Sequence, residues 1–311
     1  MTQDLVSVLM PAFKPEYLRE AMHSVLNQTH GELELLIGDN SGDPVIAEII
    51  AELDDPRVIH VPSHAVTNRS VKINHRLLWL RARGRYVRFV YDDDVIYPRS
   101  TEVLLELLKS QQGSSMAWHQ RDLIDSKSRI LARQDYLDGA ARVVMDEPTL
   151  LANLARKMNF IGEFCFLMFD RQVHPEFNFH RFDGFDIYAM WDTPMYVEAA
   201  RNGPIVGTSE FLGGFRRHEN QMSFIGGTVY GCCIDWEFLF RHGLANGKLG
   251  FEDAQRALQH IALLYAKYAD DAPALAHMGQ RLVRDLEAGR LAEGLAEFDA
   301  AYRALPPMGQ R

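Results

Sequence analysis

Short apolar runs alternate with helical patterns over about the first hundred residues. Unbroken runs of apolar, β-branched and aromatic residues predict strands at 5–11, 33–39, 58–61 and 86–91. Apolar residues spaced three or four positions apart predict helices at 16–27, 45–53, 71–83 and 101–111. An alternation of this kind predicts an α/β fold whose mostly parallel sheet has helices on both faces.

The remainder of the chain is less regular. Beyond Gln111 we expect a strand and a polar turn within 115–130, a helix from Asp146 to about Met158, a strand at 160–169, a helix at 191–202 and two short strands within 205–217. From Thr228 onwards the apolar stripes have helical spacing, which core packing explains. We therefore divide the chain into residues 1–112, residues 113–225 and a helical extension at 226–311.

Three consecutive carboxylates, Asp92, Asp93 and Asp94, follow the predicted strand at 86–91. They lie at the carboxyl end of a strand, which is where open α/β sheets bind ligands. Adjacent acids repel each other, and a hard cation such as Mg²⁺ or Mn²⁺ bound by their oxygens would relieve that repulsion. The alternative is a solvated acidic turn that caps the next helix.

The composition restricts the class of protein. The 311 residues are 47% hydrophobic and 24% charged, as in a globular protein with a substantial core. The net charge of −9 argues against a nucleic-acid partner. Cys165, Cys232 and Cys233 have no metal-ligand spacing, which favours a reducing, cytoplasmic compartment. We expect no signal peptide, because no basic region precedes the first strand, and no membrane span, because no apolar run is long enough.

Two nucleotide-binding motifs are missing from the strand ends. Neither a GxGxxG turn nor a GxxxxGK[ST] loop follows a predicted strand, so we expect neither a dinucleotide enzyme nor a P-loop NTPase. A sugar nucleotidyltransferase shares the α/β architecture but needs a glycine-rich basic loop after its first strand. Residues 12–15 form too short a loop for that class and contain no glycine.

Several segments together resemble the family 2 glycosyltransferases, which have the GT-A fold. The matching segments are 6–13, 18–29, 34–41, 82–94, 191–205 and 215–218. The resemblance covers about residues 5–223, and the order and spacing of the segments make it specific. Trp191 departs from the pattern, because the family usually has a glutamate before the catalytic aspartate.

The resemblance implies that the ends of the first two strands hold the donor nucleotide. The family uses these positions for the base and the ribose, which correspond here to Pro11, Ala12, Phe13 and Asp39. A carboxylate can accept the uracil N–H, and an aromatic or peptide plane can cover the ring. The alternative for Asp39 is a purely local Asx turn.

The acidic triplet resembles the DXD motif of the family, with Asp92 and Asp94 at that spacing. The resemblance implies that Asp94 ligates a Mn²⁺ or Mg²⁺ ion and that Asp92 contacts the ribose, while the role of Asp93 in the cofactor site stays open. His218 follows an arginine pair, as in relatives, and would complete the metal shell; a satisfied polar histidine is the alternative. The ion neutralises charge on the diphosphate as the leaving group departs.

Basic and amide side chains are expected near the donor. Arg216 and Arg217 suit the diphosphate oxygens, with one of the two facing solvent. Lys72 and Asn74 lie where the family often has a basic residue or an asparagine over the nucleotide. The local sequence departs from the Ala-Arg-Asn pattern that is usual there.

Asp192 is the expected general base. By resemblance it begins a helix and faces the anomeric carbon, where one carboxylate removes the acceptor proton and a single in-line displacement inverts the configuration. Asp183 and Asp186 are the rival bases. The alternative role for Asp192 is a helix N-cap, which is compatible with catalysis.

These expectations combine into a cytoplasmic, metal-dependent, inverting glycosyltransferase that uses a nucleotide-diphosphate sugar. The first choice of donor is a UDP-sugar and the second a dTDP-sugar. The acceptor is a glycan, a lipid-linked saccharide or a protein, contacted by the Phe-rich segment 160–185. We interpret the C-terminal helices as a stabilising or homodimerising appendage, and peripheral attachment to the inner face of the membrane stays open. The alternative is a catalytically silent, glycan-binding or scaffolding protein on the same fold.

Overall fold

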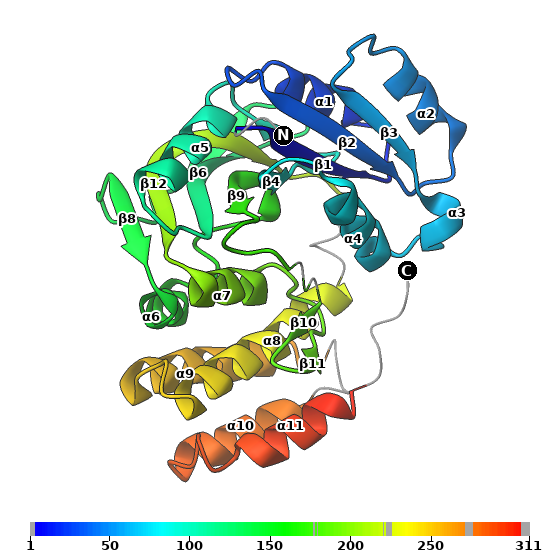
Figure 1. Cartoon of the computed structure of the whole chain (residues 1–311). Helices are drawn as coiled ribbons and strands as arrows, with labels where there is room; N and C mark the ends of the chain where they lie inside the picture. Colours follow the sequence, from blue (N-terminus) through cyan, green and yellow to red (C-terminus); the bar gives the residue numbers. More distant parts are fainter. Residues whose placement is uncertain are drawn as a thin grey trace. The chain divides into compact units, whose positions relative to one another are not determined.

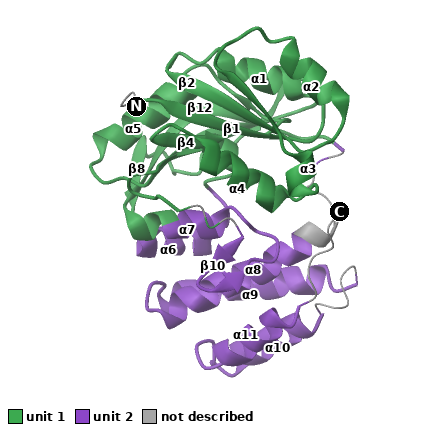
Figure 2. Cartoon of the chain, turned by 45° about the vertical axis from the view of Figure 1, so that its right-hand side comes forward, with its two compact units in different colours: residues 1–145, 161–179, 199–218 green, residues 146–160, 180–198, 219–311 purple. Residues whose placement is uncertain are grey.

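The computed structural model describes residues 4–176, 178, 180–219, 221, 226–270 and 276–305. The chain divides into two compact units, each assembled from three separate segments (Figure 2). Unit 1 contains residues 1–145, 161–179 and 199–218, and unit 2 contains residues 146–160, 180–198 and 219–311. Two aromatic residues of the expected acceptor segment, Phe177 and Phe179, lie outside the described residues.

Unit 1 is built around one sheet of ten strands (Figure 1). The strand order is β3-β2-β1-β4-β9-β6-β12-β5, with β7 paired to β6 and β8 paired to β12. The bounds are β1 Val6–Ala12, β2 Leu33–Asp39, β3 Val58–Pro62, β4 Tyr86–Phe89, β5 Val95–Ile96, β6 Met116–Ile124, β7 Ile130–Arg133, β8 Arg142–Met145, β9 Leu167–Asp170 and β12 Ile205–Arg216. The pairs β1–β2, β1–β4 and β2–β3 are parallel, which confirms the α/β half predicted for the start of the chain.

Five helices connect the strands of this half. They are α1 Leu18–Leu26, α2 Pro44–Ala51, α3 His64–Thr67, α4 Val71–Arg81 and α5 Ser100–Ser110. Four apolar residues of α1 recur at helical spacing and are buried: Leu18, Ala21, Met22 and Val25. They join residues of β1, β2 and α5 in one hydrophobic core, so tertiary packing of this stripe stabilises the helix.

Side chains just before two of these helices fix where they begin. Oδ1 of Asp43 accepts the backbone N–H of Val45 at 3.0 Å, and Pro44 occupies the first turn of α2. Oγ of Ser70 accepts the N–H of Ile73 at 3.4 Å and caps α4. Both helices therefore start beside the carboxyl ends of strands, where the expected ligand site lies.

The two short strands expected within 205–217 are wrong, because the structure has one long strand there, β12. Its pairing with β6 shifts register between Thr208 and Phe211 and again between Phe211 and Gly214. The polar residues at the first shift have a composition typical of a turn. In the structure they lie instead at an irregularity within one continuous strand.

The strand expected at 160–169 is only partly correct. Residues Phe164–Phe166 form a 3₁₀ helix, and the strand β9 begins afterwards, at Leu167. The Cys165 carbonyl in this turn accepts a hydrogen bond from Nη2 of the buried Arg88 at 2.6 Å. The Arg88 side chain therefore provides the hydrogen bond that a neighbouring strand would give to this carbonyl in a regular sheet.

Unit 2 is mainly helical. It contains α6 Glu147–Lys157, the two-stranded hairpin β10 Arg181–Phe182 and β11 Phe185–Asp186, α8 Gly226–Ala245, α9 Phe251–Lys267, α10 Ala276–Glu287 and α11 Leu295–Arg303. The helix α7, Thr193–Asn202, begins in unit 2 and ends in unit 1. α8 packs on α9 and α11, and α9 also packs on α6 and α10. No helix of the described residues is both long and apolar enough to cross a membrane.

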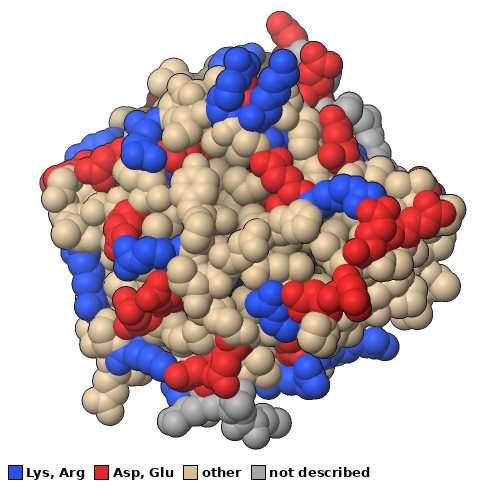
Figure 3. Space-filling model, turned by 90° about the horizontal axis from the view of Figure 1, so that it is seen from above, with Lys and Arg blue, Asp and Glu red and all other residues tan. Residues whose placement is uncertain are grey.

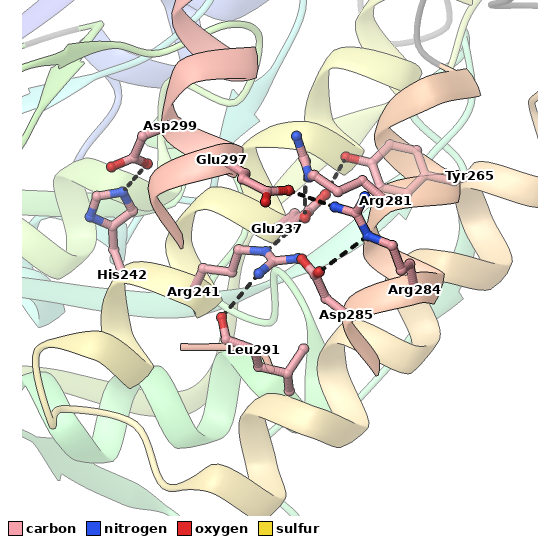
Figure 4. A network of polar contacts seen from close by, with 10 residues as sticks. All are labelled: Glu237, Arg241, His242, Tyr265, Arg281, Arg284, Asp285, Leu291, Glu297 and Asp299. Carbon is pink, nitrogen blue, oxygen red and sulfur yellow. Dashed lines mark hydrogen bonds and ion pairs between the residues drawn. The ribbon is translucent and has the colours of Figure 1, made fainter. Parts of the chain in front are cut away.

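A buried ionic network joins three helices of unit 2 (Figure 4). The guanidinium of Arg241 on α8 binds Glu237 at 2.8 Å and Asp285 of α10 at 2.8 Å, and it donates to the Leu291 carbonyl at 3.0 Å. The other oxygen of Glu237 accepts the Tyr265 hydroxyl of α9 at 2.9 Å. Because these charges are out of water, each depends on its partners, and the network fixes how α8, α9 and α10 pack.

Candidate active site

The expected nucleotide residues gather at the carboxyl edge of the parallel strands in unit 1. Ala12, at the end of β1, is the register partner of Asp39, at the end of β2. The backbone N–H groups of Phe13 and Lys14 donate to Oδ2 of Asp92 at 2.7 and 2.8 Å. The acidic triplet is thus tied directly to the loop that follows β1.

Asp92 is held in a mostly enclosed position by these two bonds. Burial raises its pKa from 3.8 to about 6, and the neighbouring charge of Asp93 acts in the same direction. The N–H groups of Phe13 and Lys14 oppose the rise, since they stabilise the carboxylate. This group can therefore change its charge in mildly acidic solution.

Asp39 does make the local turn that was the alternative to a binding role. Its Oδ1 accepts the backbone N–H of Ser41 at 3.1 Å and the Ser41 hydroxyl at 2.7 Å. Its Oδ2 lies 3.4 Å from Nε2 of His60. The turn uses one oxygen, and the second oxygen is the one that a ligand could use.

Asp94 is the most enclosed member of the triplet. Its Oδ1 accepts the backbone N–H of Arg216 at 3.0 Å, and its Oδ2 accepts the Cys165 thiol at 3.1 Å. Burial raises the pKa of Asp94 well above its ordinary value, and the charge of Asp93 contributes. Its role as a metal ligand stays a prediction, and both of its oxygens have protein partners.

Asp93 and His218 face each other. Nε2 of His218 lies 3.1 Å from Oδ2 of Asp93, and the ring of His218 packs against Tyr17 with 5.2 Å between centroids. The structure therefore brings His218 to the triplet, as expected, but to its middle residue. Among the described residues no group of three or more His, Cys, Asp and Glu side chains has an arrangement that could hold a metal ion.

The two arginines of β12 and the loop after it have different surroundings. Arg216 is fully buried: it binds Glu20 at 2.7 Å, donates to the Asp93 carbonyl at 2.7 Å, and lies over the Tyr17 ring. Arg217 is exposed. Arg216 therefore holds the triplet loop in place, and Arg217 is the one that can reach a ligand from solvent.

The two candidate donor-binding residues on α4 also differ in their surroundings. The Asn74 side chain is buried and donates to the Gly38 carbonyl at 2.9 Å, so it fastens α4 to β2. Lys72 is exposed, and its role over the nucleotide stays a prediction. The exposed Phe13 has the Arg69 guanidinium 6.0 Å from its ring centroid, a cation that the sequence analysis did not select.

Asp192 lies in unit 2, immediately before α7. Its Oδ1 accepts the N–H of Thr193 at 2.7 Å, and its Oδ2 accepts Nδ2 of Asn159 at 3.2 Å. Its backbone carbonyl accepts the N–H of Tyr196 at 3.2 Å, the first bond of the helix. Hydrogen bonds to both oxygens therefore orient the carboxylate at the start of α7.

The two rival bases differ from Asp192 in their surroundings. Asp186, with 80% of its side chain exposed, is 3.4 Å from Arg181 across the β10–β11 hairpin. Asp183 has a φ of 49° in the turn of that hairpin and is exposed. Both carboxylates are exposed, whereas that of Asp192 is partly buried.

The loop that leads to Asp192 is held by a residue that sequence analysis missed. Asp235 on α8 is buried and accepts the backbone N–H groups of Tyr188 at 3.0 Å, Ala189 at 2.5 Å and Met190 at 2.7 Å. The Tyr302 hydroxyl of α11 donates to the same carboxylate. Burial raises the pKa of Asp235, and these four donors oppose the rise. No local pattern in the sequence marks such a residue.

A known family accounts for much of the chain. Residues 7–175 match the model named Glycosyl transferase family 2, which is more than half of the chain. The chain belongs to glycosyl transferase family 2. The region matched to family 2 contains Asp39 and the acidic triplet, whereas Asp192 and His218 lie beyond it.

Two relatives are similar to this family 2 chain over about a third of its length. TuaG of Bacillus subtilis (strain 168), provisionally a teichuronic acid biosynthesis glycosyltransferase, is 32% identical over 107 residues, 33% of this chain and 42% of TuaG. WfgD of Escherichia coli, a UDP-Glc:alpha-D-GlcNAc-diphosphoundecaprenol beta-1,3-glucosyltransferase, is 26% identical over 117 residues, 37% of this chain and 46% of WfgD. The chain spans less than half the length of either relative.

A solved structure shares the fold over nearly the whole chain. The crystal structure of S. aureus TarS 1-349 in complex with UDP-GlcNAc superposes with a TM-score of 0.53, covering 96% of this chain and 91% of that chain. The identity is 14%, so the likeness shows the fold alone. Together with the family match, it confirms the GT-A fold that the resemblance implied.

Proposed function

We propose that this family 2 member transfers a sugar from a nucleotide-diphosphate donor, a UDP-sugar in the first place, to an acceptor hydroxyl. The observation that carries the proposal is the pair of hydrogen bonds from Phe13 and Lys14 to Asp92. These bonds join the loop that we assign to the base with the acids that we assign to the ribose and the diphosphate. Phe13 is exposed beside them and can cover a uracil ring.

The names of similar proteins support this choice of donor and acceptor. WfgD is named for a UDP-Glc donor and a diphosphoundecaprenol-linked acceptor, and TarS crystals contain UDP-GlcNAc or UDP. We therefore rank a UDP-sugar above a dTDP-sugar. A lipid-linked saccharide is our first choice of acceptor, ahead of a free glycan or a protein.

We also propose a divalent ion beside the triplet. Asp93 and His218 would hold it, because their facing atoms are 3.1 Å apart and the Asp93 side chain is accessible. Carboxylate oxygens suit Mn²⁺ and Mg²⁺, and an imidazole nitrogen favours Mn²⁺ of the two. Asp94 can join them only if its hydrogen bond from Cys165 opens. When bound, the ion would neutralise the charge of the departing diphosphate.

In our proposal Asp192 is the general base. Its carboxylate takes the proton of the acceptor hydroxyl while that oxygen attacks the anomeric carbon and the bond to the diphosphate breaks. A single displacement of this kind inverts the anomeric configuration. Asn159 and Thr193 orient the carboxylate before the acceptor arrives.

A thermal-shift panel of UDP- and dTDP-sugars with Mn²⁺ tests the proposal, because a donor that binds only the native state raises the melting temperature. We expect a UDP-sugar to give the largest rise and Asp39→Asn to reduce it. The matched control is Asp54→Asn, an exposed aspartate near the end of α2, which should leave the rise unchanged. A panel with no rise from any nucleotide sugar would contradict the proposal. Donor binding without release of the sugar in a hydrolysis assay would favour the catalytically silent alternative.

A further inference from the structure

One stretch of this acidic protein carries no acid at all. Residues 56–91 contain eight lysines and arginines and neither Asp nor Glu, although the chain has a net charge of −9. Several of these cations have partners: Arg57 binds Asp55, Arg83 binds Glu34, and Arg85 binds Asp170. Lys72, Arg76 and Arg81, all exposed on α4, make no ion pair with any described residue.

The outward face of α4 is apolar along its centre. Ile73 and Leu80, seven positions apart, lie on one face and expose 47% and 67% of their surfaces. By helical geometry, Arg76 lies beside this apolar line and Arg81 on its other side. Val66 of the preceding α3 is 70% exposed. Single exposed apolar residues are ordinary, but an apolar line between unpaired cations is the pattern of a helix that lies in a membrane interface.

Basic and acidic side chains are mixed on one face of the molecule (Figure 3), whereas the stretch of chain that contains α4 has basic ones alone. Figure 3 shows acidic and basic side chains interspersed among uncharged ones on the face seen from above. The cations of α4 have no such acidic neighbours in their own stretch of chain. A surface with fixed negative charge and an apolar interior complements both features of α4.

We propose that the outward face of α4 docks on a bilayer surface that contains anionic phospholipid. Arg76 and Arg81 contact lipid phosphates, and Ile73 and Leu80 enter the boundary between head groups and acyl chains. A second copy of the chain fits less well, because two such faces would bring like charges together. A nucleic acid fits less well because the centre of the face is aliphatic and offers no base-stacking surface. The proposal is independent of the sugar-transfer proposal, since docking requires neither donor nor acceptor.

Co-sedimentation of the full chain with vesicles tests it. Vesicles of phosphatidylglycerol mixed with phosphatidylcholine should bind the protein, and vesicles of phosphatidylcholine alone should not. Salt at about 0.5 M should weaken binding, because it screens the attraction. Leu80→Glu and Arg76→Glu should each weaken vesicle binding by about tenfold or more. The matched control is Leu263→Glu on α9, where a leucine of similar exposure, 69%, should tolerate the change.

Three results would overturn the proposal. The first is that the wild-type protein binds neither kind of vesicle, and the second is that it binds both equally. The third is that Leu263→Glu weakens binding as much as Leu80→Glu while both variants melt at the wild-type temperature. Binding to single-stranded RNA in the absence of vesicle binding would show that the cations serve a different polyanion.

Discussion

The backbone N–H of Met190 donates a 2.7 Å hydrogen bond to Oδ2 of Asp235, a residue on α8 that is 45 positions away in the sequence. Met190 is two residues before Asp192, so a carboxylate on α8 fixes the peptide that leads to the proposed base. The same carboxylate also holds the N–H groups of Tyr188 and Ala189. The helical region thus supports the proposed catalytic loop directly.

Asp235→Asn should loosen this loop, because an amide offers one acceptor oxygen where the carboxylate offers two. We expect faster hydrogen–deuterium exchange in a peptide covering 186–192 and a loss of about 1–3 kcal/mol of unfolding free energy. If Asp192 is the base, turnover should fall while donor affinity is unchanged. The control Asp253→Asn, on α9, removes a surface ion pair with Arg156 and should leave exchange in that peptide unchanged. Unchanged exchange in Asp235→Asn would refute the positioning role.

Asp192→Asn should reduce turnover by about 10²–10⁴-fold, the usual contribution of a general base. The amide keeps the shape and the capping ability of the side chain but cannot take the acceptor proton. Donor affinity, measured by calorimetry, should change only a few-fold. Asp186→Asn is the matched control, because its exposed carboxylate pairs with Arg181 across the hairpin. Wild-type turnover in Asp192→Asn would move the base elsewhere.

Asp92→Asn should stabilise the folded protein at neutral pH and weaken donor binding. The pKa of Asp92 is about 6 in the fold and 3.8 without its surroundings, so the folded state binds this proton more tightly than the unfolded chain. The contribution of Asp92 to the free energy of unfolding therefore decreases as the pH rises from about 4 to about 6. The variant should melt higher than wild type at pH of about 7, and the difference should shrink at pH of about 4. A variant that melts lower at both values would show that the carboxylate is stabilising.

Asp93→Asn and His218→Ala should each remove the strengthening of nucleotide binding by Mn²⁺. Both residues present donor atoms 3.1 Å apart at the triplet, and each loss leaves the ion with one protein ligand fewer. Titration calorimetry of UDP with Mn²⁺ and with EDTA measures the difference. His23→Ala, an exposed histidine on α1, should keep the metal effect. Equal affinity in Mn²⁺ and in EDTA for the wild type would remove the metal from the proposal.

Arg241→Met should cost about 3–5 kcal/mol of unfolding free energy, because it leaves Glu237 and Asp285 buried without their shared cation. Lys109→Met, on α5, removes an exposed pair with Asp4 and should cost less than about 1 kcal/mol. Urea denaturation of the two variants gives the comparison. Similar losses in both would show that the buried network contributes no more than a surface pair.

The sequence was sufficient for features that depend on local periodicity. The strands β1, β2 and β4, the helix α1 and the acidic triplet were predicted because each lies within one short stretch with a clear apolar pattern. The continuous strand β12 was missed because its polar bulge resembles a turn. A register shift depends on the neighbouring strand, which no local pattern contains.

The surroundings of the site residues were beyond sequence reasoning for a related reason. Cys165 donates to Asp94 across 71 positions, and His218 reaches Asp93 across 125. The spacing of the triplet indicated a cation site but could not show which carboxylate would be enclosed. That difference comes from Arg216 and Cys165, which the fold brings to Asp94 from distant segments.

The segmented make-up of the two units limits how the chain can be shortened or recombined. α6 and the hairpin β10–β11 are inserts in the chain of unit 1, yet α6 packs on α8 and α9 from the far end of the sequence. A protein that stopped at residue 218 would retain α6 but lose the helices that pack on it. Leu150, Leu151 and Leu154 of α6, which are buried in the full chain, would then be exposed. The last third of the gene is therefore no interchangeable cassette: exchanging it between relatives would require exchanging the two earlier inserts with it.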